Sequence, residues 1–337
     1  MLNIFYVSTA AAVLGVAAAG YYAGWQGFVF AVILSVLEIT LSFENAIVNA
    51  GVLREMDEKW RQRFLTWGII IAVFGMRLVF PIALVAFMVD LNMLEVLKLA
   101  LEQPDEYSKY LTSAHGNIAA FGGMFLLMVF LEFITDHKRE IHWLGVLERK
   151  ISLLGMFESI EMLLALSLLM IIQKFVPLEQ RYTIMLFGIA GIVTYVVIHS
   201  LAKFMNTYYI THNVGNTVKR SGAMSFIYLE CLDASFSFDG VIGAFAITKD
   251  IVIIMLGLGI GAFFVRSITI FLVRHQTLQK YVYLEHGAYY ALGSLSLLML
   301  LGIFYHVPEM LIGGIGLVLI LLAFVSSLRF TEIARRK

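Results

Sequence analysis

Residues 38–50 read Glu-Ile-Thr-Leu-Ser-Phe-Glu-Asn-Ala-Ile-Val-Asn-Ala and place two carboxylates inside a long apolar run. A charge at the centre of a membrane helix costs roughly 2.5–3.5 kcal/mol on insertion scales, so it is retained there for pairing or for function. The rest of the chain fits a membrane setting, because 60% of its residues are hydrophobic and 14% are charged. Ordinary soluble domains carry roughly 25% charged residues. The sequence therefore predicts an all-α polytopic membrane protein.

Ten apolar segments are long enough to cross a bilayer, which takes about 20 residues in a helix. They are too long and too continuous for the strands of a membrane barrel. We expect the first to be a retained helix, because a cleaved signal peptide would carry a basic start, although the small-residue run 17–20 keeps cleavage open. A charged segment, 91–103, is expected to lie at the interface. The expected spans are 4–24, 27–50, 65–89, 115–136, 151–172, 182–205, 222–248, 251–273, 284–304 and 308–330.

The charges of the connecting segments predict the orientation. With ten spans, seventeen Lys and Arg residues fall on the side of the N-terminus and five on the other side. Basic residues concentrate on the cytoplasmic side of membrane proteins. We therefore expect a multi-pass protein of the plasma (inner) membrane with both termini in the cytoplasm.

The stretch 38–50 has a second copy at 233–245, which reads Asp-Ala-Ser-Phe-Ser-Phe-Asp-Gly-Val-Ile-Gly-Ala-Phe. Further matches follow in order, since Gly68 precedes Arg77 by nine residues and Gly257 precedes Arg266 by nine. An odd number of spans separates the copies, so they cross in opposite senses. Inverted repeats of this kind place substrate sites near the bilayer midplane. Residues 1–337 are thus expected to form one transmembrane domain, with repeat one at 31–136, connecting helices at 151–205, repeat two at 226–304 and a final helix at 308–330.

The repeated acids predict a site for a hard cation. Glu38 and Glu44 lie six residues apart, which is about 240° around a straight helix, so a break between them is needed to aim both at one point. Ser-Phe-Glu-Asn and Ser-Phe-Asp-Gly are the expected breaks, since Asn and Gly weaken helices. Carboxylate, hydroxyl and freed carbonyl oxygens suit Mn²⁺, Mg²⁺ or Ca²⁺. The residues with such oxygens are Glu38, Ser42, Glu44, Asp233, Ser237 and Asp239.

Other intramembrane polar residues keep two interpretations open. Arg77 and Arg266 either tune the site or tie helices together through buried ion pairs, which contribute little net stability. Glu158 and Glu161 lie three apart, so we expect them to share a helix face. They form either an accessory ion or proton step or a polar contact between helices.

Several segments resemble the TerC family, which is named for tellurium resistance and belongs with the lysine-exporter superfamily. The resemblance covers roughly 27–330 and implies metal-site roles for Glu38, Glu44, Asn45, Asp233 and Asp239, in proteins implicated in exporting manganese and other divalent cations. The chain is similar to a divergent branch, because Glu44 stands where aspartate is expected and helices at 151–205 are added. The segments that carry the resemblance are Ser42 to Ala46, Trp67-Gly68 to Arg77, Gly122-Gly123, Phe238 to Thr248 with the Arg266 helix, and the Pro308 helix.

We therefore expect a secondary transporter that exports a hard divalent cation, manganese first, as substrate rather than as a bound cofactor. The alternative is a membrane partner or assembly factor in a metal or tellurite stress-response complex. An enzyme is not expected, because the acids lack an accompanying nucleophile or zinc motif. The expected partners are the lipid bilayer and the metal ion; nucleic acid is not expected, since Lys plus Arg and Asp plus Glu balance at 24 each. A homo-oligomer stays open.

Cysteine labelling tests the predicted orientation. In a chain whose Cys231 is replaced by serine, single cysteines at Arg54 and Lys109 should react with a membrane-impermeant maleimide from opposite sides. The reason is that one segment falls on the positively charged side and the other on the opposite side. Reaction of both cysteines from the same side would contradict the orientation and the inversion of the repeat.

Overall fold

The computed structural model describes the chain except for residues 1, 69, 90, 213–221, 306 and 337. Of the described residues, 89% are helical and none lies in a strand. The prediction of an all-α protein is confirmed. Apolar side chains of the outer helices, among them Leu163, Met170, Val318 and Leu321, are exposed on the protein surface, which is compatible with contact to lipid.

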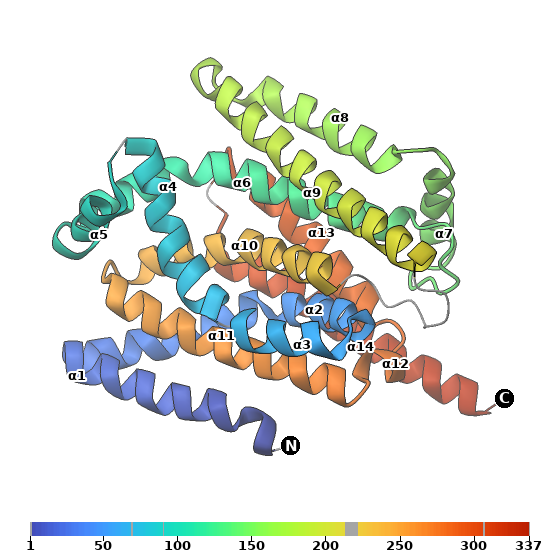
Figure 1. Cartoon of the computed structure of the whole chain (residues 1–337), viewed down its shortest axis with the longest axis horizontal. Helices are drawn as coiled ribbons and strands as arrows, with labels where there is room; N and C mark the ends of the chain where they lie inside the picture. Colours follow the sequence, from blue (N-terminus) through green and yellow to red (C-terminus); the bar gives the residue numbers. More distant parts are fainter. Residues whose placement is uncertain (1, 69, 90, 213–221, 306, 337) are drawn as a thin grey trace.

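The first helical element, α1 (Leu2–Leu41), is a hairpin of two arms (Figure 1). Its helical geometry is interrupted at Ala23 and at Gly24, whose φ of 65° is accessible to glycine without strain. The arms touch closely, because a Cβ on Gly27 would lie 2.4 Å from the carbonyl oxygen of Ala19. The predicted separation between segments 4–24 and 27–50 is therefore present.

The second predicted segment is itself divided. Helix α2 (Phe43–Glu55) follows α1 after a single non-helical residue, Ser42, with φ −105° and ψ 15°. This is the break expected in Ser-Phe-Glu-Asn. The corresponding break in Ser-Phe-Asp-Gly was predicted wrongly, because α10 (Gly222–Ile247) is helical throughout.

The third predicted segment is largely π-helical. After α3 (Glu58–Arg63), the chain forms η1 (Phe64–Gly68), η2 (Ile71–Val79) and then α4 (Phe80–Val89). Wide π turns are uncommon and often occur at functional sites. A short helix, α5 (Met93–Glu102), lies within the charged segment 91–103. A capping box between Asn92 and Glu95 marks its start as a separate helix.

Helix α6 (Pro104–Thr135) starts earlier than the predicted segment 115–136, so His115 lies within the helix and not at its start. The prediction of one helix over 151–172 was wrong. That region forms α7 (Val146–Ser152), η3 (Leu153–Met156) and α8 (Ile160–Phe175), with a bend of 101° before α8. Glu158 lies in the turn and is exposed, so it shares no helix face with Glu161.

Four of the remaining helices follow predicted segments: α9 (Leu178–His212), α11 (Ile251–Arg274), α13 (Leu284–Gly302) and α14 (Glu309–Arg336). The short helix α12 (Thr277–Lys280) lies between two predicted segments and was not predicted. By length and composition, five described helices qualify as membrane spans, or seven if each bent pair counts as one span. The five are Ile4–Leu41, Pro104–Thr135, Leu178–Phe204, Ile251–Arg274 and Leu311–Phe330.

Small residues let the central helices approach closely. The α1 hairpin packs mainly on α11, and α6 packs on α9 and α13. On α9, a Cβ at Gly191 would lie 2.3 Å from the carbonyl oxygen of Phe121. On α11, a Cβ at Gly257 would lie 2.5 Å from the Cβ of Leu34. Backbone contact at these positions fixes the distances between the helices that carry the polar side chains.

Replacing Gly191 by alanine tests the α6–α9 contact. The added methyl meets backbone rather than a movable side chain, so the helices must separate, at a cost of about 1–3 kcal/mol. The matched control is Gly314→Ala, since nothing lies within 4 Å of a Cβ there and alanine is the better helix former. Thermal unfolding in detergent should show a lower midpoint for Gly191→Ala only. Equal midpoints in both variants would contradict the close contact.

Candidate functional site

The central cavity is a small polar space of about 50 Å³ enclosed by α1, α2, the two π segments, α10 and α11. It holds three of the residue pairs that the repeat matched: Glu38 with Asp233, Ser42 with Ser237, and Arg77 with Arg266. Its volume admits a few water-sized molecules at most. The other lining residues are Asn45, Asn49, Phe64, Gly68, Ala72, Ala262, Val265 and Thr269.

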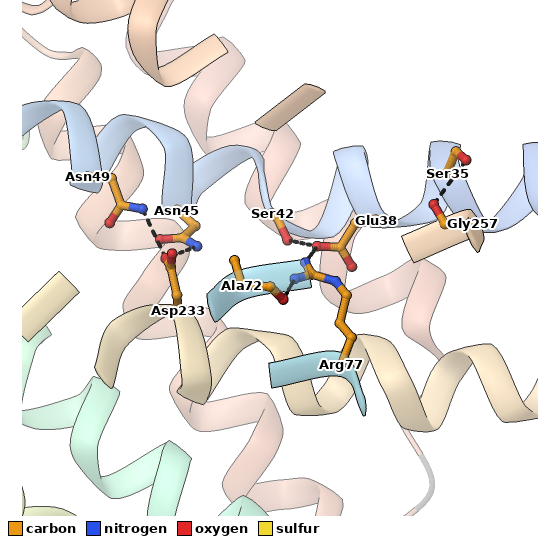
Figure 2. Close-up of polar contacts among 9 residues, drawn as sticks. All are labelled: Ser35, Glu38, Ser42, Asn45, Asn49, Ala72, Arg77, Asp233 and Gly257. Atoms are coloured by element: carbon orange, nitrogen blue, oxygen red, sulfur yellow. Dashed lines mark hydrogen bonds and ion pairs between the residues drawn. The ribbon is translucent and has the colours of Figure 1, made fainter. Parts of the chain in front are cut away.

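Glu38 is 1% exposed and is paired with Arg77, which is 6% exposed (Figure 2). Its Oε1 also accepts a hydrogen bond of 2.8 Å from the hydroxyl of Ser42. The other end of the Arg77 guanidinium donates to the carbonyl oxygen of Ala72. Because both charges are nearly dry, each one depends on the other for compensation.

Asp233 is compensated differently, by neutral amides. Its Oδ1 accepts hydrogen bonds from Asn45 Nδ2 at 2.7 Å and Asn49 Nδ2 at 2.9 Å (Figure 2). The two amides are one helical turn apart on α2, so they reach the same carboxylate oxygen. Their Oδ1 atoms and the Ser237 hydroxyl are buried without a hydrogen-bond partner. Buried acceptors in this state are costly and indicate an absent partner or a function.

Arg266 lines the same cavity and donates to the carbonyl oxygen of Phe64 at 3.1 Å. Glu230, one turn before Asp233 on α10, is 8% exposed and has no partner at either carboxylate oxygen. It lies against Gly68, where a Cβ would come within 2.9 Å of its Oε1.

Glu44 does not join this cavity. It is 2% exposed, and its Oε2 faces α14, where a Cβ on Gly316 would lie 3.3 Å away. That oxygen has no hydrogen-bond partner. The break at Ser42 is one residue long, so it leaves Glu38 and Glu44 on different faces and does not aim them at one point. The side chain of Asp239, the expected partner of Glu44, lies outside the described residues.

The other predicted acids are separate from the central cavity. Glu161 accepts a hydrogen bond of 2.6 Å from Thr135 and so links α8 to α6, as the interpretation of a polar contact between helices expects. Glu158 is exposed in the turn before α8. Within the described part of the chain, no three His, Cys, Asp or Glu side chains are grouped to hold a metal ion.

Sequence reasoning missed Asn49, Glu230 and Thr269 as parts of this region. Asn49 carried a usable signal, because it follows Asn45 by four residues and therefore shares its helix face. Glu230 has no acidic counterpart in the first copy, where Ser35 takes its position, and its place beside Gly68 depends on packing that no local pattern encodes.

The fold and this interior define a helical protein with several candidate membrane spans and a polar centre that contains the Arg77–Glu38 pair. Comparison with family profiles gives one match, to the family described as "Protein of unknown function (DUF475)", over residues 43–334. The chain belongs to that family, and the matched region runs from α2 into α14. Searches of curated proteins and of solved structures give no match.

Replacing Glu38 by glutamine tests the buried ion pair. The change leaves the Arg77 charge buried without its partner, so the free energy of unfolding should fall by about 3–5 kcal/mol. Adding Arg77→Gln should recover part of that loss, because the double variant buries no unpaired charge.

The matched control is Glu58→Gln, whose partner Arg61 lies 2.9 Å away on the surface of α3. Exposed pairs contribute about 0–1 kcal/mol, so this variant should unfold almost like the parent. Denaturant unfolding in detergent micelles makes the comparison. Additive effects of the two central changes would contradict a mutually dependent pair.

Proposed function

We propose that this protein is a secondary transporter that exports a hard divalent cation, manganese first, through the central cavity. The observation that carries the proposal is the set of buried oxygen atoms on that cavity. Two carboxylates, two amide oxygens and two hydroxyls converge there, contributed by Glu38, Asp233, Asn45, Asn49, Ser42 and Ser237. Hard cations prefer such ligands. A divalent ion would also complete the amide and hydroxyl oxygens that lack partners.

Reciprocal contacts support the inverted repeat as part of this proposal. Under the matching that pairs 38 with 233, position 45 corresponds to 240 and position 35 to 230. Asn45 contacts Asp233, and Gly240 reciprocally lies beside Glu38, 3.1 Å from its Oε2 to an added Cβ. Ser35 likewise donates to the carbonyl oxygen of Gly257 at 3.0 Å, while Glu230 lies against Gly68. A twofold relation between the copies accounts for both exchanges.

The proposal includes the finer membrane arrangement. Ten crossings follow if each bent pair is one span, if the α1 hairpin contributes two spans, and if α10 and α13 also cross, despite the acids of α10. With ten crossings, the excess of basic residues on one side of the membrane orients both termini toward the cytoplasm. The proposed location is the plasma membrane. A relationship to the TerC and lysine-exporter proteins, tellurium resistance and a homo-oligomeric state belong to the same proposal.

Arg77 would control access to the site. The four charged side chains that line the cavity, Glu38, Asp233, Arg77 and Arg266, sum to zero. A divalent cation can therefore bind Glu38 only as the Arg77 guanidinium withdraws. Arg77 lies in the π-helical η2, and a change from π to α hydrogen bonding there would rotate and shift its side chain.

Helix α10 would provide the route. Its first turns line a large polar cavity through Ser225 and Tyr228, its middle lines the central cavity, and its last turns line an apolar cavity through Ile242 and Ala246. Ser225 and Asp233 are about 12 Å apart along the helix axis. Spaces at both ends of one helix, with a small closed site between them, fit alternating access.

Asp233→Asn tests the transport site. The asparagine keeps an oxygen that accepts from Asn45 and Asn49, so the protein should fold, but the cation loses a charged ligand. Flux of ⁵⁴Mn²⁺ in proteoliposomes, at matched protein content, should fall by at least roughly tenfold.

The matched control is Asp105→Asn, which removes an exposed carboxylate paired with Lys249 and should leave flux unchanged. Glu44→Gln should also retain flux, because Glu44 faces α14; a loss equal to that of Asp233→Asn would move the site toward Glu44 and Asp239. If the parent protein moves none of Mn²⁺, Mg²⁺ and Ca²⁺, the transporter proposal fails and the assembly-partner alternative gains.

A further inference from the structure

A polar space of about 690 Å³ lies between α6, α8, α9 and the start of α10; we name it the α6–α9 cavity. It is distinct from the central cavity, which residues of both repeats line. Its walls include Glu132 of α6 and His199 of α9. It is separated from the central cavity along α10 by buried Leu229 and Leu232. It therefore needs an explanation of its own.

Three ionisable side chains form one cluster on its wall. Glu132 Oε1 lies 3.2 Å from His199 Nδ1, and Glu132 Oε2 accepts a hydrogen bond from the Tyr195 hydroxyl. Tyr195 is 4% exposed and is held by an edge-on contact with Phe125. The Glu132 and His199 side chains are 42% and 46% exposed, so the pair faces the cavity while its tyrosine is anchored in the protein.

The neighbouring charges are engaged elsewhere. Asp136 accepts from the backbone of Lys138, Glu161 accepts from Thr135, and Arg139 stacks on the ring of Phe133 at 3.4 Å. The ionisable groups that face the cluster from all surrounding elements are Asp136, His137, Lys138 and Arg139 after α6, Glu161 of α8, Lys203 of α9, Tyr228 of α10 and Tyr289 of α13.

A metal ion does not fit this cluster, because no third acid or histidine of the described residues is grouped with Glu132 and His199. If the Glu132–His199 pair only linked α6 to α9, it would not require a neighbouring cavity large enough to hold water. Carboxylate–histidine pairs inside membrane proteins mark proton pathways. Histidine is also the side chain whose charge changes most readily near neutral pH.

We propose that Glu132, His199 and Tyr195 form the binding site for the proton that drives cation export. The inference rests on the proposed transport function and names its coupling ion. His199 Nδ1–H donates to the Glu132 carboxylate, and a proton from water on the outer side binds Nε2, so that the imidazolium pairs with the carboxylate. After the conformational change the proton leaves Nε2 for water on the cytoplasmic side, so one proton enters as the cation is exported, and the Tyr195 hydroxyl continues to hold the carboxylate. Helix α10 packs against both α6 and α9 and also carries Asp233, so occupancy of the cluster can reach the cation site.

Two measurements in proteoliposomes separate proton coupling from cation translocation: net transport driven by a pH gradient, and isotope exchange without a gradient. A pH gradient should drive ⁵⁴Mn²⁺ accumulation by the parent protein, and ⁵⁴Mn²⁺ should also exchange with unlabelled Mn²⁺ without a gradient. Glu132→Gln should lose gradient-driven accumulation and keep exchange at the parent rate, because exchange requires no net proton transfer. His199→Gln should behave in the same way, and Tyr195→Phe should shift the pH dependence of accumulation while preserving the contact with Phe125.

The matched control is Glu161→Gln, the same substitution in the same cavity at a carboxylate bound to Thr135; it should keep both activities. If Glu132→Gln keeps gradient-driven accumulation, the proton site is wrong. If a folded Glu132→Gln loses exchange as well, Glu132 belongs to the cation path and the inference is again overturned. If the parent protein exchanges none of Mn²⁺, Mg²⁺ and Ca²⁺, the transport function itself is refuted.

Discussion

Carboxylates enclosed by apolar helices cannot remain charged without compensation, and the centre of this protein is organised around that constraint. Glu38 is compensated by a guanidinium, and Asp233 by two amide groups. Both solutions need helices that are far apart in the sequence to approach closely. Glycines permit this approach, since Gly261 lies directly against the side chain of Glu38. The packing of α1, α2 and η2 on α10 and α11 is therefore inseparable from the charges it encloses.

Much of the helical architecture could be predicted, because hydrophobicity over 20 residues reports the environment of a segment directly. The joint at Gly24 and the break at Ser42 were also readable from local residue types. The repeat predicted that Glu38 and Asp233 would meet in one place, and both line the central cavity. The two residues are far apart in the sequence, but each belongs to one copy of the same motif, and that is why they could be paired.

The failures came where packing decides the local conformation. Gly240 was interpreted as a helix breaker, yet α10 continues through it, and the missing side chain instead leaves room for Glu38. The bend before α8 depends on Ser159, which adopts a left-handed conformation with φ 58° that its residue type does not announce. Nothing in segment 65–89 distinguishes π from α turns, since nearly all of its side chains are apolar and no periodic pattern marks one buried face. The sequence analysis expected the break to turn Glu44 toward the same point as Glu38. The break at Ser42 is only one residue long, and the two carboxylates remain on different faces.

The charge balance of the central cavity limits what any transport cycle can do. Its two acids and two arginines are neutral together, so a bound divalent ion would add two uncompensated charges to a nearly dry space. At about 4 Å and an effective dielectric constant near 20, each charge pair is worth roughly 4 kcal/mol. An ion that displaced no positive charge would thus be repelled by Arg77 and Arg266 as strongly as the acids attract it. Under the proposed transport function, cation binding is therefore accompanied by withdrawal of a guanidinium or by movement of protons. A site that is neutral when it contains no ion favours exchange of positive charges over simple permeation.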